Sequence, residues 1–191
     1  MDEPTVAAEA RRRFALLQDD PRALDGPLKT TWLAIAARNA SASEWDRLRQ
    51  LATTAPGQVE RQAFYRLLGA AKDPALAQKA LDFALTGEAG TSSAAIIAAV
   101  SAENADLAFD FAVAHRAAVE ALVDSGGQPD YIAGLAAASR DPAMIGKLER
   151  FGATLTSDLR RPVDARIAAL RQRLDSEPRL TREIGQWLAR R

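Results

Sequence analysis

The 191-residue sequence contains no cysteine and only one histidine. The absence of cysteine excludes disulfides, thiolate zinc sites and cysteine nucleophiles, and it leaves the compartment open between cytoplasm and periplasm. No apolar run approaches the ~20 residues that span a bilayer. The opening residues, Met1 to Thr5, also lack the basic and apolar regions of a signal peptide. We therefore expect a soluble chain without a membrane partner, and a segment excised from a longer polypeptide.

The sequence also lacks net charge, because 25 basic residues balance 25 acidic ones. A neutral chain has no global field to hold a nucleic-acid backbone or an anionic membrane surface. Valine and isoleucine are few, whereas alanine makes up about a fifth of the chain, and this composition favours helices over strands. With 48% hydrophobic residues, the chain is long enough to bury the core of one domain.

Proline and glycine mark the ends of the expected helices. Proline suits the first helical position because its missing N–H would be unpaired there, and an acidic residue before it can cap the free amides. Acid-proline pairs of this kind occur at Asp20-Pro21, Asp73-Pro74, Asp141-Pro142 and Glu177-Pro178. Further helix starts are predicted at Pro27, Ser43 with Asp46, Pro56, Asn104 and Pro129, and stops at Gly26, Gly87, Gly126-Gly127 and Gly152.

Between these marks the sequence predicts helices over 4–19, 27–40, 44–54, 57–71, 74–86, 92–101, 105–124, 129–139, 142–152, 159–175 and 178–190. Apolar residues recur at helical spacing, as in the stripe of Leu107, Phe111, Ala114, Ala118 and Leu122 and in the stripe of Val163, Ile167, Leu170 and Leu174. Short connections force consecutive helices to lie antiparallel. Because the acid-proline marks are unevenly spaced, we expect residues 1–191 to form one all-α domain of stacked antiparallel helix pairs. The expected form is an irregular superhelix like HEAT or armadillo arrays rather than a strict tetratricopeptide repeat.

Few residues are candidates for chemistry. His115 lies on the predicted helix 105–124, and a single histidine cannot form a His-x-x-x-His zinc pair. We interpret it as a partly buried structural residue rather than a general base, with no Gly-x-Ser-x-Gly elbow to support a serine triad. The segment Gly87 to Ser92 resembles a phosphate loop but lacks its lysine and follows a helix, so we interpret it as a helix end and a turn.

The aromatic residues are scattered at one or two per predicted helix. This spacing is typical of core anchors rather than of a base-stacking platform or a cofactor site. The set consists of Trp32, Trp45 and Trp187 and of the phenylalanines at 14, 64, 83, 109, 111 and 151.

Charge is unevenly distributed along the chain. Residues 74–138 carry Lys79 and Arg116 against eight acids, a net of −6, whereas residues 158–191 carry nine arginines against five acids, a net of +4. The simpler interpretation is a solvated face in each case. The functional interpretation is an acidic surface towards a cationic ligand and a basic end that docks on another part of a larger protein.

Three segments resemble a known family. Arg66-Leu67-Leu68-Gly69-Ala70-Ala71-Lys72-Asp73-Pro74-Ala75-Leu76 continues through Ala80 to Glu88, and an aromatic helix follows at Ala105 to Phe111. Together with the opening at Glu9 to Phe14 and the closing Ile184-x-x-Trp187-Leu188, they resemble the C-terminal helical domain of zinc aminopeptidases of the aminopeptidase N, puromycin-sensitive and endoplasmic-reticulum type. The chain departs from that pattern at Phe109 and at Ala89 to Ser93.

The resemblance implies a HEAT-like bowl over a thermolysin-like catalytic domain, enclosing a peptide cavity. It implies a parent zinc aminopeptidase whose zinc motif lies upstream, with that catalytic domain and the peptide substrate as partners. For this chain we expect no catalytic residue, no metal ligand and no cofactor, and the resemblance assigns no substrate-contact residue. Two other functions remain open: a free-standing helical-repeat scaffold for a partner protein, and nucleic-acid binding through the C-terminal arginines.

Overall fold

In the computed structural model, which describes residues 3–17, 19–20 and 22–190, every regular element is a helix. The first six α-helices are α1 (Pro4–Leu16), α2 (Lys29–Arg38), α3 (Ala42–Thr54), α4 (Gln58–Leu68), α5 (Pro74–Ala84) and α6 (Ser93–Glu103). They are followed by α7 (Ala105–Ala114), α8 (Arg116–Glu120), α9 (Gln128–Leu135), α10 (Ala143–Ala153) and α11 (Ser157–Ala189). Two short 3-10 helices, η1 (Gly90–Ser92) and η2 (Ala136–Ala138), complete the set among the described residues. The all-α prediction is confirmed.

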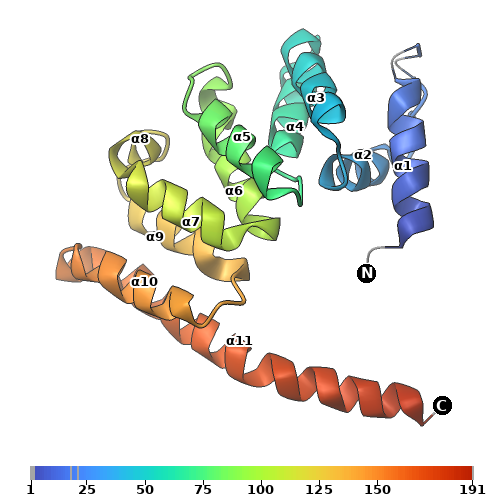
Figure 1. Ribbon diagram of the computed structural model, residues 1–191. Helices are drawn as coiled ribbons and strands as arrows, with labels where there is room; N and C mark the ends of the chain where they lie inside the picture. Colours follow the sequence, from blue (N-terminus) through green and yellow to red (C-terminus); the bar gives the residue numbers. More distant parts are fainter. Residues whose placement is uncertain (1–2, 18, 21, 191) are drawn as a thin grey trace.

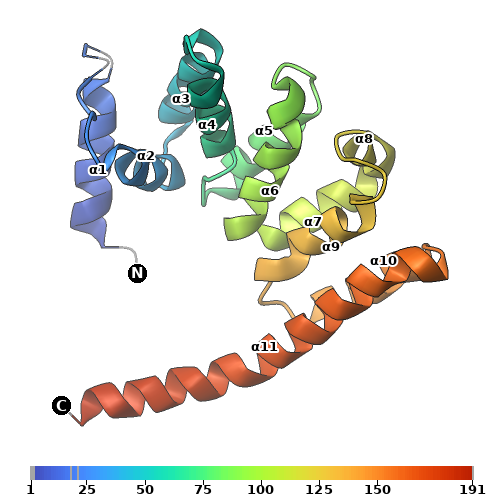
Figure 2. The same ribbon diagram turned by 180° about the vertical axis from the view of Figure 1, so that it is seen from behind.

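The helices pack as stacked pairs along an arc. The pairs are α1 with α2, α3 with α4, α5 with α6, α7 with α9, and α10 with α11 (Figure 1). Viewed from behind, α4, α6 and α9 lie nearer than α3, α5 and α7, so the pairs make two layers (Figure 2). The first helix of each pair begins at residue 4, 42, 74, 105 or 143, and this uneven spacing agrees with the predicted irregular superhelix.

Hydrogen bonds link each turn between pairs to the next turn along the array. The amide of Lys72 donates to the carbonyl of Arg38 at 3.1 Å, and the side chain of Asn104 donates to the carbonyl of Ala71 at 2.9 Å. Further along, the Ser139 hydroxyl donates to Asp106 at 2.8 Å. These bonds satisfy polar groups at helix ends, and they connect successive pairs.

Small residues let the layers approach closely. A Cβ atom built on Gly69, at the end of α4, would lie 2.3 Å from the carbonyl oxygen of Ile96 and 2.9 Å from the amide nitrogen of Val100 on α6. Only glycine fits at this crossing. Nearby, the hydroxyl of the partly buried Tyr131 donates to the carbonyl of Ala94 at 2.7 Å, and burial raises the pKa of Tyr131.

Two of the predicted helix starts in the first half of the chain are wrong. Helix α3 is capped by Ser41 and Glu44 in a reciprocal capping box, not by Ser43 and Asp46. Asp46 instead forms an ion pair with Lys79 of α5 at 2.6 Å. No helix begins after Asp20: Pro21 lies outside the described residues, and the described residues around it form turns held by bonds such as Ala23 N–H to Asp20 O.

The predicted helix 105–124 is broken at His115. Its backbone there, at φ −107° and ψ 32°, separates α7 from α8. The turn lets Val119 become fully buried, whereas Ala114 and Ala118 of the predicted stripe are exposed. Tertiary packing therefore determines where this helix breaks, although apolar residues recur at helical spacing across the break.

The predicted helices 159–175 and 178–190 are one helix. Helix α11 continues through Glu177 and Pro178, so this acid-proline pair is not a helix start. Proline removes one backbone hydrogen bond, but here it lies on an exposed part of the helix, where water can satisfy the released carbonyl. The stripe prediction for the earlier part of α11 is confirmed, because Val163, Ile167 and Leu170 are buried.

Candidate functional site

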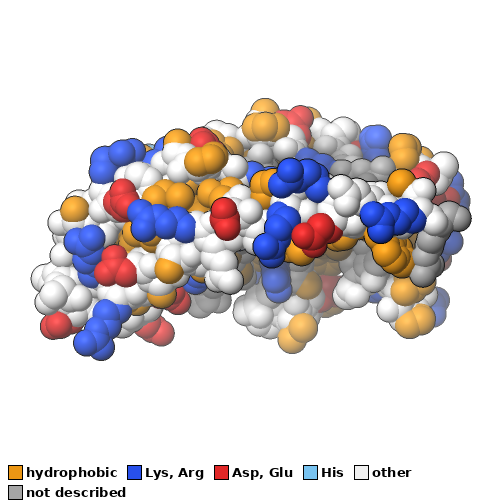
Figure 3. All heavy atoms as spheres, turned by 90° about the horizontal axis from the view of Figure 1, so that it is seen from below, with side chains coloured by type: hydrophobic (Ala, Val, Ile, Leu, Met, Phe, Trp, Pro, Cys, Tyr) orange, Lys and Arg blue, Asp and Glu red, His pale blue; other side chains and the backbone are white. Residues whose placement is uncertain are grey.

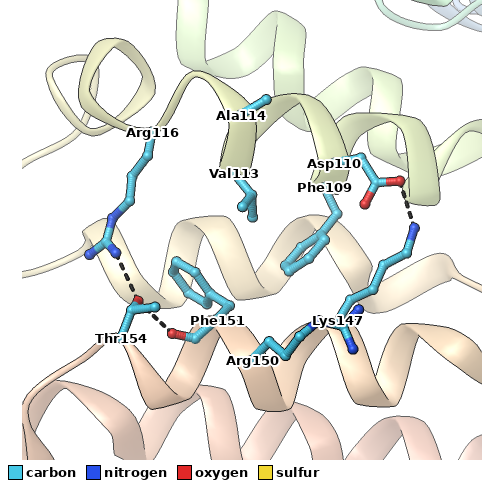
Figure 4. Close-up of a pocket in the computed structure, with 9 residues that line it drawn as sticks. All are labelled: Phe109, Asp110, Val113, Ala114, Arg116, Lys147, Arg150, Phe151 and Thr154. Atoms are coloured by element: carbon cyan, nitrogen blue, oxygen red, sulfur yellow. Dashed lines mark hydrogen bonds and ion pairs between the residues drawn. The ribbon is translucent and has the colours of Figure 1, made fainter.

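A cavity of about 530 Å³ lies between α7 and α10 (Figure 4). Its floor is aromatic, because Phe109 of α7 and Phe151 of α10 are buried and meet edge to face, with ring centroids 6.1 Å apart. Val113, which is 40% exposed, lines the cavity on the α7 side. A concave apolar surface of this size can hold a side chain of a ligand.

Helix α10 places two cations at the edge of this cavity. Lys147 and Arg150 are three residues apart and therefore lie on the same side of the helix. The Lys147 ammonium forms an ion pair with Asp110 of α7 at 2.6 Å. Arg150 is exposed and forms no ion pair within the part of the chain that the structure describes.

A third cation, Arg116, enters from the start of α8. The helix break at His115 turns Arg116 towards α10, where its guanidinium lies 5.3 Å from the ring centroid of Phe151 and donates to the Thr154 hydroxyl at 2.9 Å (Figure 4). Arg116 also pairs with Glu120 at 2.6 Å. The orientation of this guanidinium is therefore fixed by partners on two helices.

The arrangement combines an aromatic floor with a mostly cationic edge. Three cations but only one carboxylate, Asp110, line the cavity. Charge-assisted hydrogen bonds from arginine and lysine favour carboxylates and other anions. The cavity thus suits a ligand that carries an apolar group next to an anionic one.

His115 is not partly buried as predicted. It is exposed at the junction of α7 and α8, with its ring centroid 4.5 Å from that of Phe111. His115 lies at a helix end rather than in the middle of a long helix, so its side chain lies outside the core. It does not line the cavity, although its neighbour Arg116 does.

The segment Gly87 to Ser92 forms a helix end and a turn, as predicted. Gly87 and Gly90 adopt positive φ values of 83° and 53°, and η1 follows. This geometry belongs to the connection between α5 and α6. It offers no strand before the loop and no lysine for phosphate binding.

The aromatic residues are largely core anchors, as predicted. All six phenylalanines are buried, and so is Trp45, whose indole N–H donates to the carbonyl of Leu68 at 2.9 Å. Trp32 is partly buried against the core. The prediction is wrong for Trp187, which is 52% exposed because α11 has extended beyond the helices that cover its first half.

The acidic segment 74–138 is not a free acidic surface. Five of its carboxylates form ion pairs, four of them with cations on helices outside the segment. These pairs are Glu88 with Arg49, Glu103 with Arg38, Asp110 with Lys147, Asp130 with Arg166, and Glu120 with Arg116. The ion pairs of these acids are therefore mostly with basic residues of other helix pairs.

The basic C-terminal segment is partly neutralised in the same way. Arg160, Arg166, Arg171 and Arg179 pair with acids, and Arg173 donates to the carbonyl of Ser139.

Among the described residues, no group of three or more His, Asp or Glu side chains is placed to hold a metal ion. The donor set of the sequence, with one histidine and no cysteine, does not fit a catalytic zinc site. No helix in the described part of the chain is long and apolar enough to cross a membrane.

The cavity between α7 and α10 was not predicted from the sequence. The spacing of Lys147 and Arg150 was the one available signal, since it puts two cations on one side of a helix that also carries Phe151. The opposite wall of the cavity includes Arg116, whose position depends on the helix break at His115. The regular spacing of apolar residues in this segment had predicted an unbroken helix.

Comparison with known proteins gives one family match. The model of the ERAP1-like C-terminal domain matches residues 1–172, which is most of the chain. No curated protein sequence matches it. The match supports the family resemblance found in the sequence, and it ends within α11, so that the last part of this helix lies beyond it.

Proposed function

Since this chain belongs to the ERAP1-like C-terminal domain family, we propose that it is the non-catalytic C-terminal domain of a zinc-dependent aminopeptidase. In this role it encloses the substrate cavity of the parent enzyme and helps to select peptides. The zinc, the catalytic base and the peptide-bond chemistry belong to the upstream catalytic domain, which is its partner in the same polypeptide.

The observation that carries the selection role is the cavity between α7 and α10. Peptides combine apolar side chains with carboxylates, either in acidic residues or at the C-terminus. The aromatic floor at Phe109 and Phe151 suits the apolar side chain, and Arg150 suits a carboxylate next to it. Binding a remote part of a peptide would raise the efficiency of cleavage for substrates long enough to reach the cavity.

The proposal is tested on the parent enzyme with Arg150→Ala. Arg150 is exposed, so its removal should leave folding intact. We expect kcat/KM to fall about 3- to 10-fold for long peptides that carry an acidic or C-terminal carboxylate next to an apolar residue, because one charge-assisted contact is lost. A single aminoacyl amide, which cannot reach the cavity, should be cleaved as before.

The matched control is Arg161→Ala, which removes another exposed arginine at the start of α11, away from the cavity lining. It should change neither substrate class. Equal loss on long and short substrates with Arg150→Ala, or no loss on either, would contradict a role of this cavity in peptide selection.

A further inference from the structure

The last part of α11 exposes a row of large apolar side chains. Leu180, Ile184, Trp187 and Leu188 are 47%, 57%, 52% and 60% exposed. We call them the distal stripe. From Pro178 to Ala189 every residue is exposed, and α11 extends as a single helix past the start of α10 (Figures 1 and 2). Seen from below, where α11 is the nearest helix, apolar side chains reach the surface between lysines and arginines (Figure 3).

The distal stripe is not a continuation of the face that α11 buries. The buried face is formed by Val163, Ile167 and Leu170, with Leu174 partly buried beside them. At about 100° per residue, the distal stripe is rotated by roughly 90° around the helix from that face. The helices α9 and α10, which cover the buried face, therefore cannot also cover the distal stripe.

The spacing within the distal stripe is that of a two-helix seam. Leu180, Ile184 and Trp187 follow one another at intervals of four and three residues, as the a and d positions of a heptad do. Leu188 lies on one edge of this seam. Glu183 and Arg190 lie on the other edge, seven residues apart and with opposite charges.

We propose that the distal stripe pairs antiparallel with the distal stripe of a second copy of this chain. With the twofold axis near Gln186, Ile184 of each copy packs against the partner's Trp187. In the same register Glu183 lies opposite the partner's Arg190, and the symmetry makes this ion pair twice. Within its own helix Glu183 has only a loose, exposed ion pair with Arg179 at 3.7 Å, which costs little to give up.

The size of the distal stripe sets the strength of the association. The distal stripes of the two copies would bury at most roughly 800 Å² in total, below the 1,200–2,000 Å² of stable complexes. The pair is therefore weak and concentration-dependent. Pairing also supports the helix itself, because the stretch after Pro178 is exposed and contains Gly185, a residue that weakens a helix interior.

This surface lies beyond residue 172, outside the family match, so the proposal does not rest on the proposed function. The test is sedimentation equilibrium of the 191-residue chain from micromolar to millimolar concentration. The unaltered chain should show a reversible monomer–dimer equilibrium. Glu183→Arg and Arg190→Glu each place like charges opposite one another twice, and each should weaken the association at least 10-fold.

The decisive experiment is sedimentation equilibrium of Glu183→Arg and Arg190→Glu mixed in equal amounts. In the mixed pair both charge contacts are again between opposite charges, so the association should return to near the unaltered strength. Arg182→Glu, on the other side of the helix, is the matched control and should change little. A chain that stays monomeric throughout, or a mixture no stronger than either variant alone, would overturn the proposal. Protection of the distal stripe from solvent only within the longer parent polypeptide would also overturn the proposal, because the upstream domain would then cover the stripe.

Discussion

Single side chains fix the ends of helices and join neighbouring pairs. At the start of α3, Glu44 accepts hydrogen bonds from the Ser41 amide at 2.7 Å and from the Arg11 guanidinium of α1 at 2.8 Å. One carboxylate thus caps a helix and connects the first pair to the second. Partial burial alone would raise the pKa of Glu44, but the hydrogen bonds from Arg11 and Ser41 outweigh it and the pKa is lowered from 4.5.

The lowered pKa of Glu44 predicts an acid-sensitive part of the stability. A carboxyl group whose pKa is depressed by folding contributes stability above its unfolded pKa, and this contribution disappears as the pH falls through the folded pKa. We expect Glu44→Gln to lower the free energy of unfolding by about 1 kcal/mol at pH 7. The difference from the unaltered chain should shrink as the pH is lowered below about 4. Urea denaturation at several pH values measures it.

The control for Glu44 is Asp19→Asn, which removes an exposed carboxylate that forms no ion pair within the described part of the chain. It should leave the free energy of unfolding nearly unchanged at both ends of the pH range. A Glu44→Gln difference that stays constant with pH would show that the ionised carboxylate is not what stabilises this junction.

At the scale of elements, the crossing of α4 and α6 depends on a glycine. Gly69→Ala would push a methyl group against the backbone of α6, where no flexible side chain can move aside. We expect the free energy of unfolding to fall by about 1–3 kcal/mol. Gly126→Ala is the control, because nothing lies within 4 Å of the added atom. If both variants unfold alike, α4 and α6 do not approach as closely as described.

The packing of α11 on the array gives a second prediction for an element. Leu170 is 3% exposed on the buried face of α11, and Leu170→Ala should cost about 2–5 kcal/mol through lost burial and a residual cavity. Leu159→Ala, on the same helix but 43% exposed, should cost less than about 1 kcal/mol. Chemical denaturation of both variants compares them. Similar costs would contradict the assignment of the buried face.

At the scale of the whole molecule, local signals predicted which segments are helical better than where helices break. Asp73-Pro74 starts α5 as predicted, because Asp73 caps the amides of Ala75 and Leu76. Glu177-Pro178 carries the same signal, yet α11 passes through it. The difference is tertiary: α11 is already a helix anchored by its buried first half, so the proline only removes one bond on an exposed surface.

The candidate cavity could not be predicted from the sequence, for a related reason. It needs Phe109, Phe151 and Arg116 from three different helices, and it needs the break at His115 that no proline or glycine marks. The family resemblance, by contrast, depended on consecutive residues around Asp73-Pro74, and the family match supports it. Features carried by consecutive residues could be predicted from the sequence, whereas contacts between helices far apart in the sequence could not.

We propose that this domain has no catalytic centre of its own and that it acts through the peptide that it binds and the cavity that it encloses. A catalytic zinc needs three protein ligands and an open position, and a single histidine without cysteine leaves mainly carboxylates, which suit harder ions. The most direct measurement is metal analysis of the purified 191-residue chain after dialysis, beside an aminopeptidase assay on the same sample. We predict no stoichiometric zinc and no cleavage of aminoacyl substrates by a cooperatively folded chain. One equivalent of bound zinc, or activity that a chelator abolishes, would contradict a non-catalytic role for this domain.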